Sequence, residues 1–337
     1  MRAKYYRYLL QFKRPSGTSR GVLYEKETFI LEVFDNDKKG IGECAVFRGL
    51  SYDDVPDYEE KLQWLCENIE ERPEYLNEKL REYPSIWFGY EQAMLNLKYG
   101  DHLYFPGEFT EGKSFITING LIWMGDVNYM EEQIQDKLSQ GFHCIKLKIG
   151  VDWNSEHDIL KSLRKKFSRD QLELRVDANG GFTPDKAGEV LKQLADLQIH
   201  SIEQPVKAGN WKEMAELCLH TPTPIALDEE LIGILDTEKK KELLETIRPQ
   251  YIILKPSLVG GFLGSDEWIA LAEDYKIGWW ITSALESNMG LNAIAQYTYT
   301  KNNEMPQGLG TGALFTNNFE SQLALEGEKL FFRKIIS

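Results

Sequence analysis

The sequence is poor in the residues that build metal clusters and disulfide scaffolds: its 337 residues include only four cysteines and five histidines. The cysteines lie far apart and form no CxxC pair, which indicates buried thiols in a reducing compartment. No apolar run approaches the roughly 20 residues that cross a bilayer. The N-terminal residues also lack the apolar core of a signal peptide. We therefore expect a cytoplasmic protein with no membrane partner.

Basic residues are also in the minority. There are 39 Lys and Arg against 53 Asp and Glu, so the formal net charge is −14. Nucleic acids and anionic lipids bind clustered positive charge, so we expect neither as a partner. The composition is otherwise that of a globular protein, and the length suits one large domain or two ordinary ones. The oligomeric state is left open.

The chain changes character near residue 114. Before that point the patterns predict two strands, a mobile loop between them and then helical segments, in that order: residues 3–12 and 22–34, 13–20, and 52–80 and 85–99. Strands followed by helices are typical of a small α+β domain. We place this domain at residues 1–113.

Beyond residue 114, short apolar runs alternate with amphipathic stretches of helical length. Seven such stretches separate eight strand candidates: residues 115–119, 144–149, 172–177, 201–204, 225–228, 251–255, 278–284 and about 307–310. This alternation predicts right-handed βαβ units that close into a barrel. We therefore predict an α/β fold with a modified TIM barrel, (β/α)7β, over residues 114–312. The segment 313–337 is expected to return to the first domain and to end there as a strand.

Charged residues occur late in five of the barrel strands and in phase with one another. They are Lys146 and Lys148 on strand two, Asp177 on strand three, Glu203 on strand four, Asp228 on strand five and Lys255 on strand six. Residues two apart on a strand point the same way, and chemistry in such barrels is found at the carboxyl ends of the strands. A single charge at a strand end is usually solvated. Solvation does not explain, however, why the charged residues of five strands all lie at the same level of the barrel.

The three carboxylates would repel one another strongly unless a cation neutralised them. Carboxylate oxygens suit Mg²⁺ or Mn²⁺, so we predict that Asp177, Glu203 and Asp228 hold one of these ions. Strands two and six lie opposite each other in a ring of eight, which puts lysines on both sides of the metal. Three histidines precede strands, one lies in a helix and one lies before the barrel, so none is expected to act as ligand or base.

These residues resemble the enolase superfamily, in its muconate-lactonising subgroup. The motifs that carry the resemblance are Gly40-Ile-Gly-Glu-Cys-Ala45, Lys146-x-Lys148, Asp177-Ala-Asn179, Glu203-Gln-Pro205, Asp228-Glu229 and Lys255-Pro256. The resemblance implies a capping domain built by the N-terminal region and the C-terminal tail. It also implies a magnesium-dependent lyase in which the metal stabilises an enediolate formed from a small carboxylate substrate.

The resemblance assigns the lysines. Lys148 would be the base and would return the proton to the departing hydroxyl. Lys146 and the metal would favour its deprotonated form near neutral pH. Lys255, on the opposite side, would stabilise the enediolate by its charge.

Six further residues are candidates for substrate binding. Arg175 would bind a substrate carboxylate or pair with a metal carboxylate, and Asn179 would orient a ligand or cap a turn. Ser283 is placed to hydrogen-bond to the substrate, whereas Glu286 would touch the ligand or anchor a lysine or a loop. Gly310 and Thr311 belong to a glycine turn whose amides could bind a carboxylate. Residues 47–51 and the loop 13–20 would form a lid over the barrel mouth.

Three functions remain open at this point. A dehydratase is favoured over a dipeptide epimerase, because the resemblance implies an Asp-x-Asp pair in dipeptide epimerases and the turn at 308–312 has no acidic residue. The missing pair says less about N-acyl substrates. A racemase or epimerase of N-acylamino acids or dipeptides would also use opposed lysines. A barrel that only binds ligands is the third, and retention of every charged group argues against it.

Overall fold

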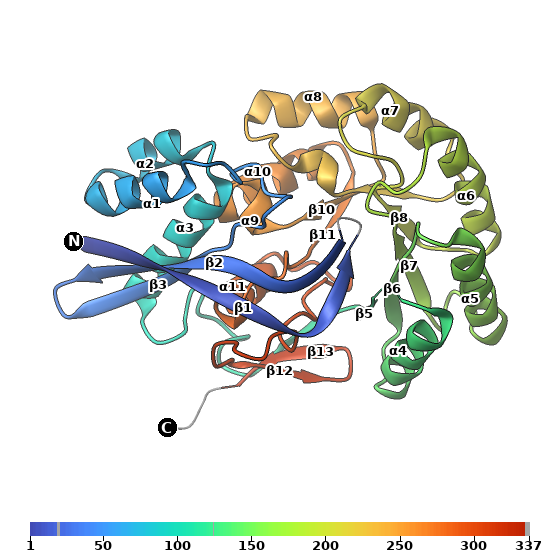
Figure 1. Ribbon diagram of the computed structural model, residues 1–337, viewed down its shortest axis with the longest axis horizontal. Coiled ribbons are helices and arrows are strands. Elements are labelled where there is room, and N and C mark those ends of the chain that lie inside the picture. Colours follow the sequence, from blue (N-terminus) through green and yellow to red (C-terminus); the bar gives the residue numbers. More distant parts are fainter. Residues whose placement is uncertain (19–20, 124, 334–337) are drawn as a thin grey trace.

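An antiparallel sheet with three helices forms one end of the structure, and a ring of parallel strands surrounded by helices forms the other (Figure 1). This computed structural model describes residues 1–18, 21–123 and 125–333. Within those residues no helix is long and apolar enough to cross a membrane.

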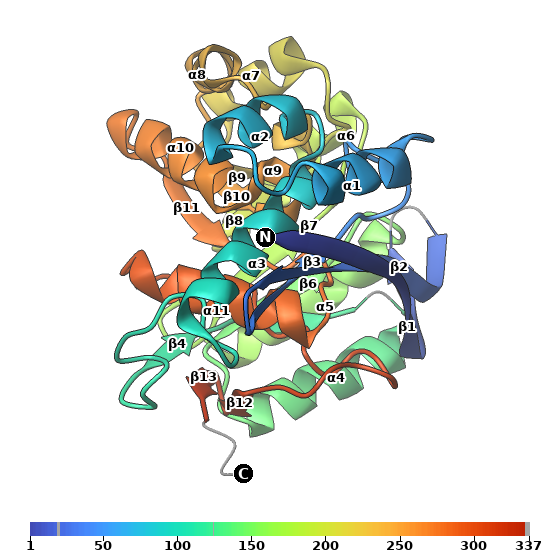
Figure 2. The ribbon, with the colours of Figure 1, turned by 90° about the vertical axis from the view of Figure 1, so that its left-hand side faces the viewer.

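The first end, which faces the viewer in Figure 2, is the predicted α+β unit. Its elements are β1 (Arg2–Thr18), β2 (Gly21–Asp35), β3 (Lys38–Cys44), α1 (Tyr58–Glu67), α2 (Pro73–Leu80) and α3 (Pro84–Tyr99). Both glycines of the 40–45 motif let α3 lie against β3, because a Cβ atom on Gly42 would collide with the backbone of Gly89. A contact this close requires residues without side chains.

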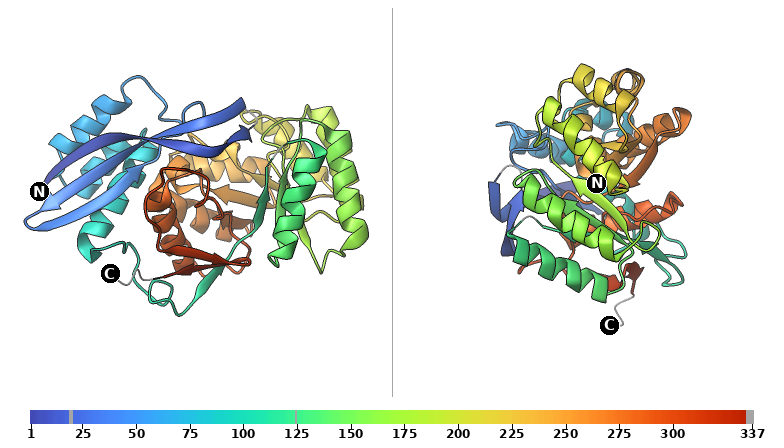
Figure 3. Two further views of the ribbon diagram at one scale, coloured as in Figure 1. Left: turned by 60° about the horizontal axis from the view of Figure 1, so that its bottom comes forward. Right: turned by 90° about the vertical axis from the view of Figure 1, so that its right-hand side faces the viewer.

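The predicted loop at 13–20 is wrong for the part that the structure describes. β1 continues to Thr18 and pairs with β2 up to Gly21, although the register shifts between Gln11 and Ser16. Residues 19 and 20 lie outside the described residues. The long hairpin extends away from α1 and α2 toward the barrel (Figures 1 and 3).

Seven parallel strands form the barrel sheet in the order β11-β10-β9-β8-β7-β6-β5. They are β5 (Gly120–Ile122), β6 (Cys144–Lys148), β7 (Glu173–Asp177), β8 (Ser201–Glu203), β9 (Ile225–Leu227), β10 (Tyr251–Leu254) and β11 (Gly278–Ile281). Parallel bridges from Thr282 to Gly308 and from Ile118 to Gln307 join the two edges of this sheet. Residues 307–308 thus take the place of the eighth strand, as predicted.

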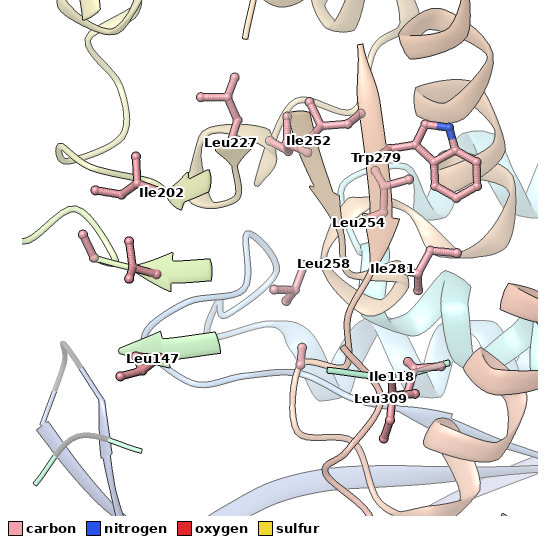
Figure 4. Close-up of a cluster of buried hydrophobic side chains, with 14 of the residues drawn as sticks. Ile118, Leu147, Ile202, Leu227, Ile252, Leu254, Leu258, Trp279, Ile281 and Leu309 are labelled. Carbon is pink, nitrogen blue, oxygen red and sulfur yellow. The ribbon is translucent and has the colours of Figure 1, made fainter. Parts of the chain in front are cut away.

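Helical crossovers cover the outside of the ring (Figure 3, right). They are α4 (Val127–Ser139), α5 (Trp153–Lys166), α6 (Pro184–Asp196), α7 (Trp211–His220), α8 (Thr237–Ile247) after the short 3-10 turn η1 (Glu229–Leu231), α9 (Pro256–Val259) with α10 (Gly261–Asp274), and α11 (Asn288–Thr300). Apolar side chains of successive strands form the core (Figure 4). Leu147 and Ile202, for example, alternate with the charged residues of their own strands and are buried.

A small third sheet corrects two predictions. β4 (Phe115–Thr117), predicted as part of the first barrel strand, pairs instead with β13 (Lys329–Phe332), which pairs in turn with β12 (Leu323–Glu326). The first barrel strand is β5, which begins at Gly120 and is preceded by the isolated bridge of Ile118. The final strand therefore does not pair with the sheet of the first domain, although Phe332 packs against Phe109. It is the segment around Phe315 that reaches β1, through a bridge with Phe12.

Candidate active site

The polar residues predicted at the strand ends meet at one rim. Lys148, Asp177 and Glu203 are the last residues of β6, β7 and β8, and they stand side by side in the register of the sheet. Asp228 and Lys255 follow directly after β9 and β10. Each takes an interior-facing position because successive side chains of its strand point alternately toward the helices and toward the barrel interior.

Ion pairs bind these groups into one network. The Lys146 Nζ lies 2.8 Å from Glu203 Oε2 and 3.3 Å from Asp177 Oδ2, and the Lys148 Nζ lies 3.0 Å from the same Asp177 oxygen. The Lys255 ammonium contacts Asp228 Oδ2 and lies 4.0 Å from Glu203 Oε1. All six side chains are 13% exposed or less, so solvent screens these charges little.

The buried network changes the acidities of its members. Burial and the nearby Asp177 raise the pKa of Glu203 to about 7, and burial also raises the pKa of Asp228. Burial alone would raise the pKa of Asp177, but Lys148 and Lys146 outweigh it and lower that pKa. Burial alone would lower the pKa of Lys255, but the carboxylates of Asp228 and Glu203 raise it. The lysines therefore stabilise the charged form of Asp177, whereas burial disfavours the charged forms of Glu203 and Asp228.

The donor set suits a divalent cation, although the lysines now pair with the carboxylates. Among the described residues, no three His, Cys, Asp or Glu side chains are grouped as a ready metal site. Glu203 Oε1, however, is buried and has no hydrogen-bond partner among them. A buried carboxylate oxygen without a hydrogen bond is costly and is a natural ligand for a hard cation. The residues present thus fit Mg²⁺ or Mn²⁺.

A pocket opens above this network at the barrel mouth. Its lining includes eight predicted site residues: Lys146, Lys148, Asp177, Asn179, Lys255, Ser283, Gly310 and Thr311. Glu203 and Asp228 lie beneath it and are 2% exposed. Phe47 and Leu50 of the predicted lid segment also line the pocket. The part of the lid predicted at 13–20 does not appear in the pocket wall, insofar as those residues are described.

Glu286 lies behind the pocket wall rather than in it. Its carboxylate accepts hydrogen bonds from Ser283 Oγ at 2.6 Å, from the Ala284 amide at 2.7 Å and from Ser257 Oγ at 2.6 Å. Thr311 Oγ1 donates to Ser283 Oγ at 2.9 Å. Glu286 was predicted to touch the ligand or to anchor a lysine or a loop. These contacts favour the anchoring role, because Glu286 connects the loop after β11 to the segment after Lys255.

The prediction that Arg175 binds a substrate carboxylate or pairs with a metal carboxylate is wrong. Its side chain points to the other end of the barrel, where Nε donates to Glu173 at 2.7 Å and Nη1 donates to the Pro306 carbonyl at 2.8 Å. Its guanidinium also lies 4.3 Å from the ring centroid of Trp280. Arg175 has the same phase as Asp177 but belongs to a deeper layer, so its long side chain fills the barrel core.

Several pocket residues were not predicted as site residues, although Glu229 and Gly308 belong to segments quoted above. They are Asn119, Leu121, Trp123, Glu229, Thr282, Ala284, Leu285 and Gly308. Asn119 is a polar residue at the end of an apolar stretch, which is the pattern that identified the other strand-end residues. Glu229 gave no such signal, because it lies in a turn after the strand, where alternation no longer predicts direction.

Comparison with known proteins identifies the family. A family model described as "Enolase C-terminal domain-like" matches residues 129–326, and one described as "MenC, N-terminal domain" matches residues 1–97. The o-succinylbenzoate synthase of Desulfotalea psychrophila is 45% identical over 97% of this chain and 98% of its own length. This chain belongs to the o-succinylbenzoate synthase family. The synthase family lies within the enolase superfamily, as the motifs predicted.

Solved structures agree with membership of the synthase family. The crystal structure of MenC from Desulfotalea psychrophila matches with a TM-score of 0.88 and 41% identity, covering 98% of this chain and 99% of that one. A substrate-liganded L-Ala-D/L-Glu epimerase from Bacillus subtilis has a TM-score of 0.85 at 20% identity, covering 98% and 96%, which shows the shared fold alone. The predictions of a capped barrel and of a lyase are confirmed. Enzymes of this superfamily use a divalent metal ion, generally Mg²⁺.

Proposed function

We propose that this chain catalyses the o-succinylbenzoate synthase reaction of menaquinone biosynthesis. The reaction converts 2-succinyl-6-hydroxy-2,4-cyclohexadiene-1-carboxylate into 2-succinylbenzoate and water. One observation carries the choice: the 45% identity to a synthase extends over both the capping unit and the barrel. The L-Ala-D/L-Glu epimerase of Bacillus subtilis, by contrast, matches at 30% identity over 52% of the chain.

Asp177, Glu203 and Asp228 would hold the metal, and we propose Mg²⁺ with Mn²⁺ as a possible substitute. Their carboxylates already meet at one rim, and Glu203 Oε1 has no hydrogen bond among the described residues. When bound, the ion supplies positive charge beside the substrate carboxylate, where negative charge develops as the α-proton leaves. Lys146, 2.8 Å from Glu203, would keep the carboxylates and the substrate in charge balance.

Lys148 and Lys255 would carry out the chemistry. Lys148 Nζ reaches the pocket from β6 and would remove the proton on the carbon next to the substrate carboxylate. The same group would then donate a proton to the departing hydroxyl, which leaves as water and creates the aromatic ring. Lys255 lines the pocket from beyond β10, and its positive charge would stabilise the developing enediolate.

The remainder of the pocket would select the substrate. Ser283, Thr311 and the backbone at Gly310 offer hydrogen bonds away from the lysines, which suits the succinyl chain. Asn179 lies next to Lys148, and Phe47 and Leu50 would cover the ring. Glu286 would contribute by fixing Ser283.

An N-acylamino acid racemase or dipeptide epimerase is the second candidate, since both lysines line the pocket and an epimerase shares the fold. Arginine keeps the positive charge of lysine but does not exchange protons near neutral pH. Lys148→Arg should therefore abolish dehydration. Lys255→Arg should retain measurable dehydration, if the guanidinium fits, and lose any racemisation. Dehydration that survives in Lys148→Arg would show that the base is misassigned.

Three broader assignments belong to the same proposal. We keep a capping domain at residues 1–113, a barrel at 114–312 and a C-terminal segment at 313–337, in line with the separate family models for the two parts. We propose the cytoplasm as the compartment, from the cysteine usage. The partner is a small carboxylate substrate.

A further inference from the structure

A short hydrogen-bonded chain runs from the proposed base to a carboxylate that the mechanism does not use. Lys148 Nζ donates to Asn179 Oδ1 at 2.6 Å, and Asn179 Nδ2 donates to Glu229 Oε1 at 3.0 Å. The three residues come from three different strand ends, and all three line the pocket. Only the side chain of Asn179 thus separates the Glu229 carboxylate from the Lys148 nitrogen that would take the proton.

The chemistry of the three groups fixes the order of this chain. A lysine ammonium only donates hydrogen bonds and a carboxylate only accepts them, whereas an amide does both. With Glu229 on one side, the Asn179 amide must turn its NH₂ group to Glu229 and its oxygen to Lys148. Without that acceptor, nothing in the chain would prevent the amide from rotating and presenting NH₂ to the ammonium.

Backbone hydrogen bonds hold Asn179 and Glu229, the second and third residues of this chain, in place. Asn179 has a φ of 43°, in the left-handed region that asparagine tolerates better than most residues. Its backbone N–H donates to Asp177 Oδ1 at 3.1 Å. On either side of Glu229, the amides of Asp228 and Glu230 both donate to Gln204 Oε1, at 3.2 and 3.3 Å. The Asn179–Glu229 pair is therefore supported independently of Lys148.

We propose that Glu229 is a positioning residue that acts on Lys148 through Asn179; this inference rests on the proposed function. Lys148 Nζ has two acceptors, Asp177 Oδ2 at 3.0 Å and Asn179 Oδ1 at 2.6 Å. A metal ion bound by Asp177 would compete with Lys148 for that carboxylate. Asn179 Oδ1 would then be the acceptor that orients the Lys148 amine. Glu229 would keep that acceptor turned toward it.

The test compares Glu229→Ala with the wild-type enzyme loaded with Mg²⁺. We expect kcat to fall 10- to 100-fold, KM to change less than threefold, and the primary deuterium isotope effect at the α-carbon to increase, because proton removal becomes slower. Mg²⁺ affinity should stay within threefold. An isotope effect in Glu229→Ala equal to that of the wild type would overturn the proposal. A loss of Mg²⁺ affinity that parallels the loss of kcat would also overturn it, since Glu229 would then be a metal ligand.

A charge exchange provides the matched variants. Asn179→Asp alone should be more severe than Glu229→Ala, because two carboxylates then face each other. Combining it with Glu229→Gln should recover at least tenfold in kcat over Asn179→Asp, since the new Asp accepts from Lys148 and from the Gln amide. Absence of recovery in the folded double variant would contradict the proposal.

A third readout does not require turnover, and so separates this inference from the proposed function. Reductive methylation followed by peptide mass spectrometry measures the reactivity of each lysine. Lys148 should react at least threefold faster in Glu229→Ala than in the wild type, while Lys255 keeps its rate. Equal rates at Lys148 would overturn the positioning role, whereas failure of the wild type to turn over the synthase substrate would overturn only the proposed function.

Discussion

Removal of the Lys255 ammonium should weaken catalysis and strengthen metal binding at the same time. Lys255 contacts Asp228 and lies 4.0 Å from Glu203, and its side chain is 13% exposed. In Lys255→Met these two carboxylates lose a buried cation. Loss of one partner of a buried ion pair costs about 3–5 kcal/mol of stability, so the metal-free variant should unfold at a clearly lower urea concentration.

Magnesium should restore much of that stability, because it takes over the carboxylates that the ammonium left. We expect Mg²⁺ to bind Lys255→Met at least about tenfold more tightly, which corresponds to about 1.4 kcal/mol. Turnover should nevertheless fall by about 10²–10³, the usual effect of losing one preorganised electrostatic group in an active site. Isothermal titration calorimetry, urea unfolding with and without Mg²⁺, and the aromatisation assay measure the three quantities.

Lys240→Met is the matched control. Lys240 is also a buried lysine in an ion pair, 2.6 Å from Glu267, but it lies on α8 and does not line the active-site pocket. This control should lose stability without a change in Mg²⁺ affinity or in kcat. Weaker Mg²⁺ binding in Lys255→Met than in the wild type would refute the arrangement of charges on which the site is built.

The other predictions concern the metal, the packing of α3 on β3 and the pH dependence of stability. Glu203→Gln should abolish Mg²⁺ binding in calorimetry while circular dichroism shows a folded protein; retained affinity would exclude Glu203 as a ligand. Gly42→Ala should cost about 2–3 kcal/mol of unfolding free energy, since the new methyl group meets the backbone of α3. Gly188→Ala, in open space on α6, should be neutral or stabilising, and equal effects of both changes would contradict this packing. Burial raises the pKa of Asp53 from 3.8 to about 6 in the folded state. The folded protein therefore keeps a proton that the unfolded chain has released, so stability should fall by about 2 kcal/mol as pH rises from 4 to 6. Asp53→Asn should lack this decline in urea unfolding, and an identical decline in both proteins would contradict the assignment.

The sequence predicted the barrel and the rim because alternation has a simple physical cause. Each strand buries one face against helices and turns the other to the interior, so Lys148, Asp177 and Glu203 share a phase that can be read without coordinates. The order of strands and the lengths of the crossovers followed from the same pattern.

Phase alone could not predict depth or the path of the loops. Arg175 shares the phase of Asp177, yet its side chain extends to the opposite end of the barrel, toward Glu173 and Pro306. Glu229 follows its strand in a turn, and only the turn brings it to Asn179. The short strand at 115–117 has no pattern of its own that distinguishes pairing with β13 from pairing within the barrel.

The most direct test of the central claim is an absorbance assay of the wild-type chain with 2-succinyl-6-hydroxy-2,4-cyclohexadiene-1-carboxylate. Aromatisation to 2-succinylbenzoate changes the ultraviolet absorbance. The account predicts turnover that requires Mg²⁺, stops on chelation, returns when Mg²⁺ is restored, and is absent in Lys148→Arg. No aromatisation under these conditions, together with Mg²⁺-dependent exchange of the α-proton of an N-acylamino acid or a dipeptide, would contradict it and identify a racemase or epimerase.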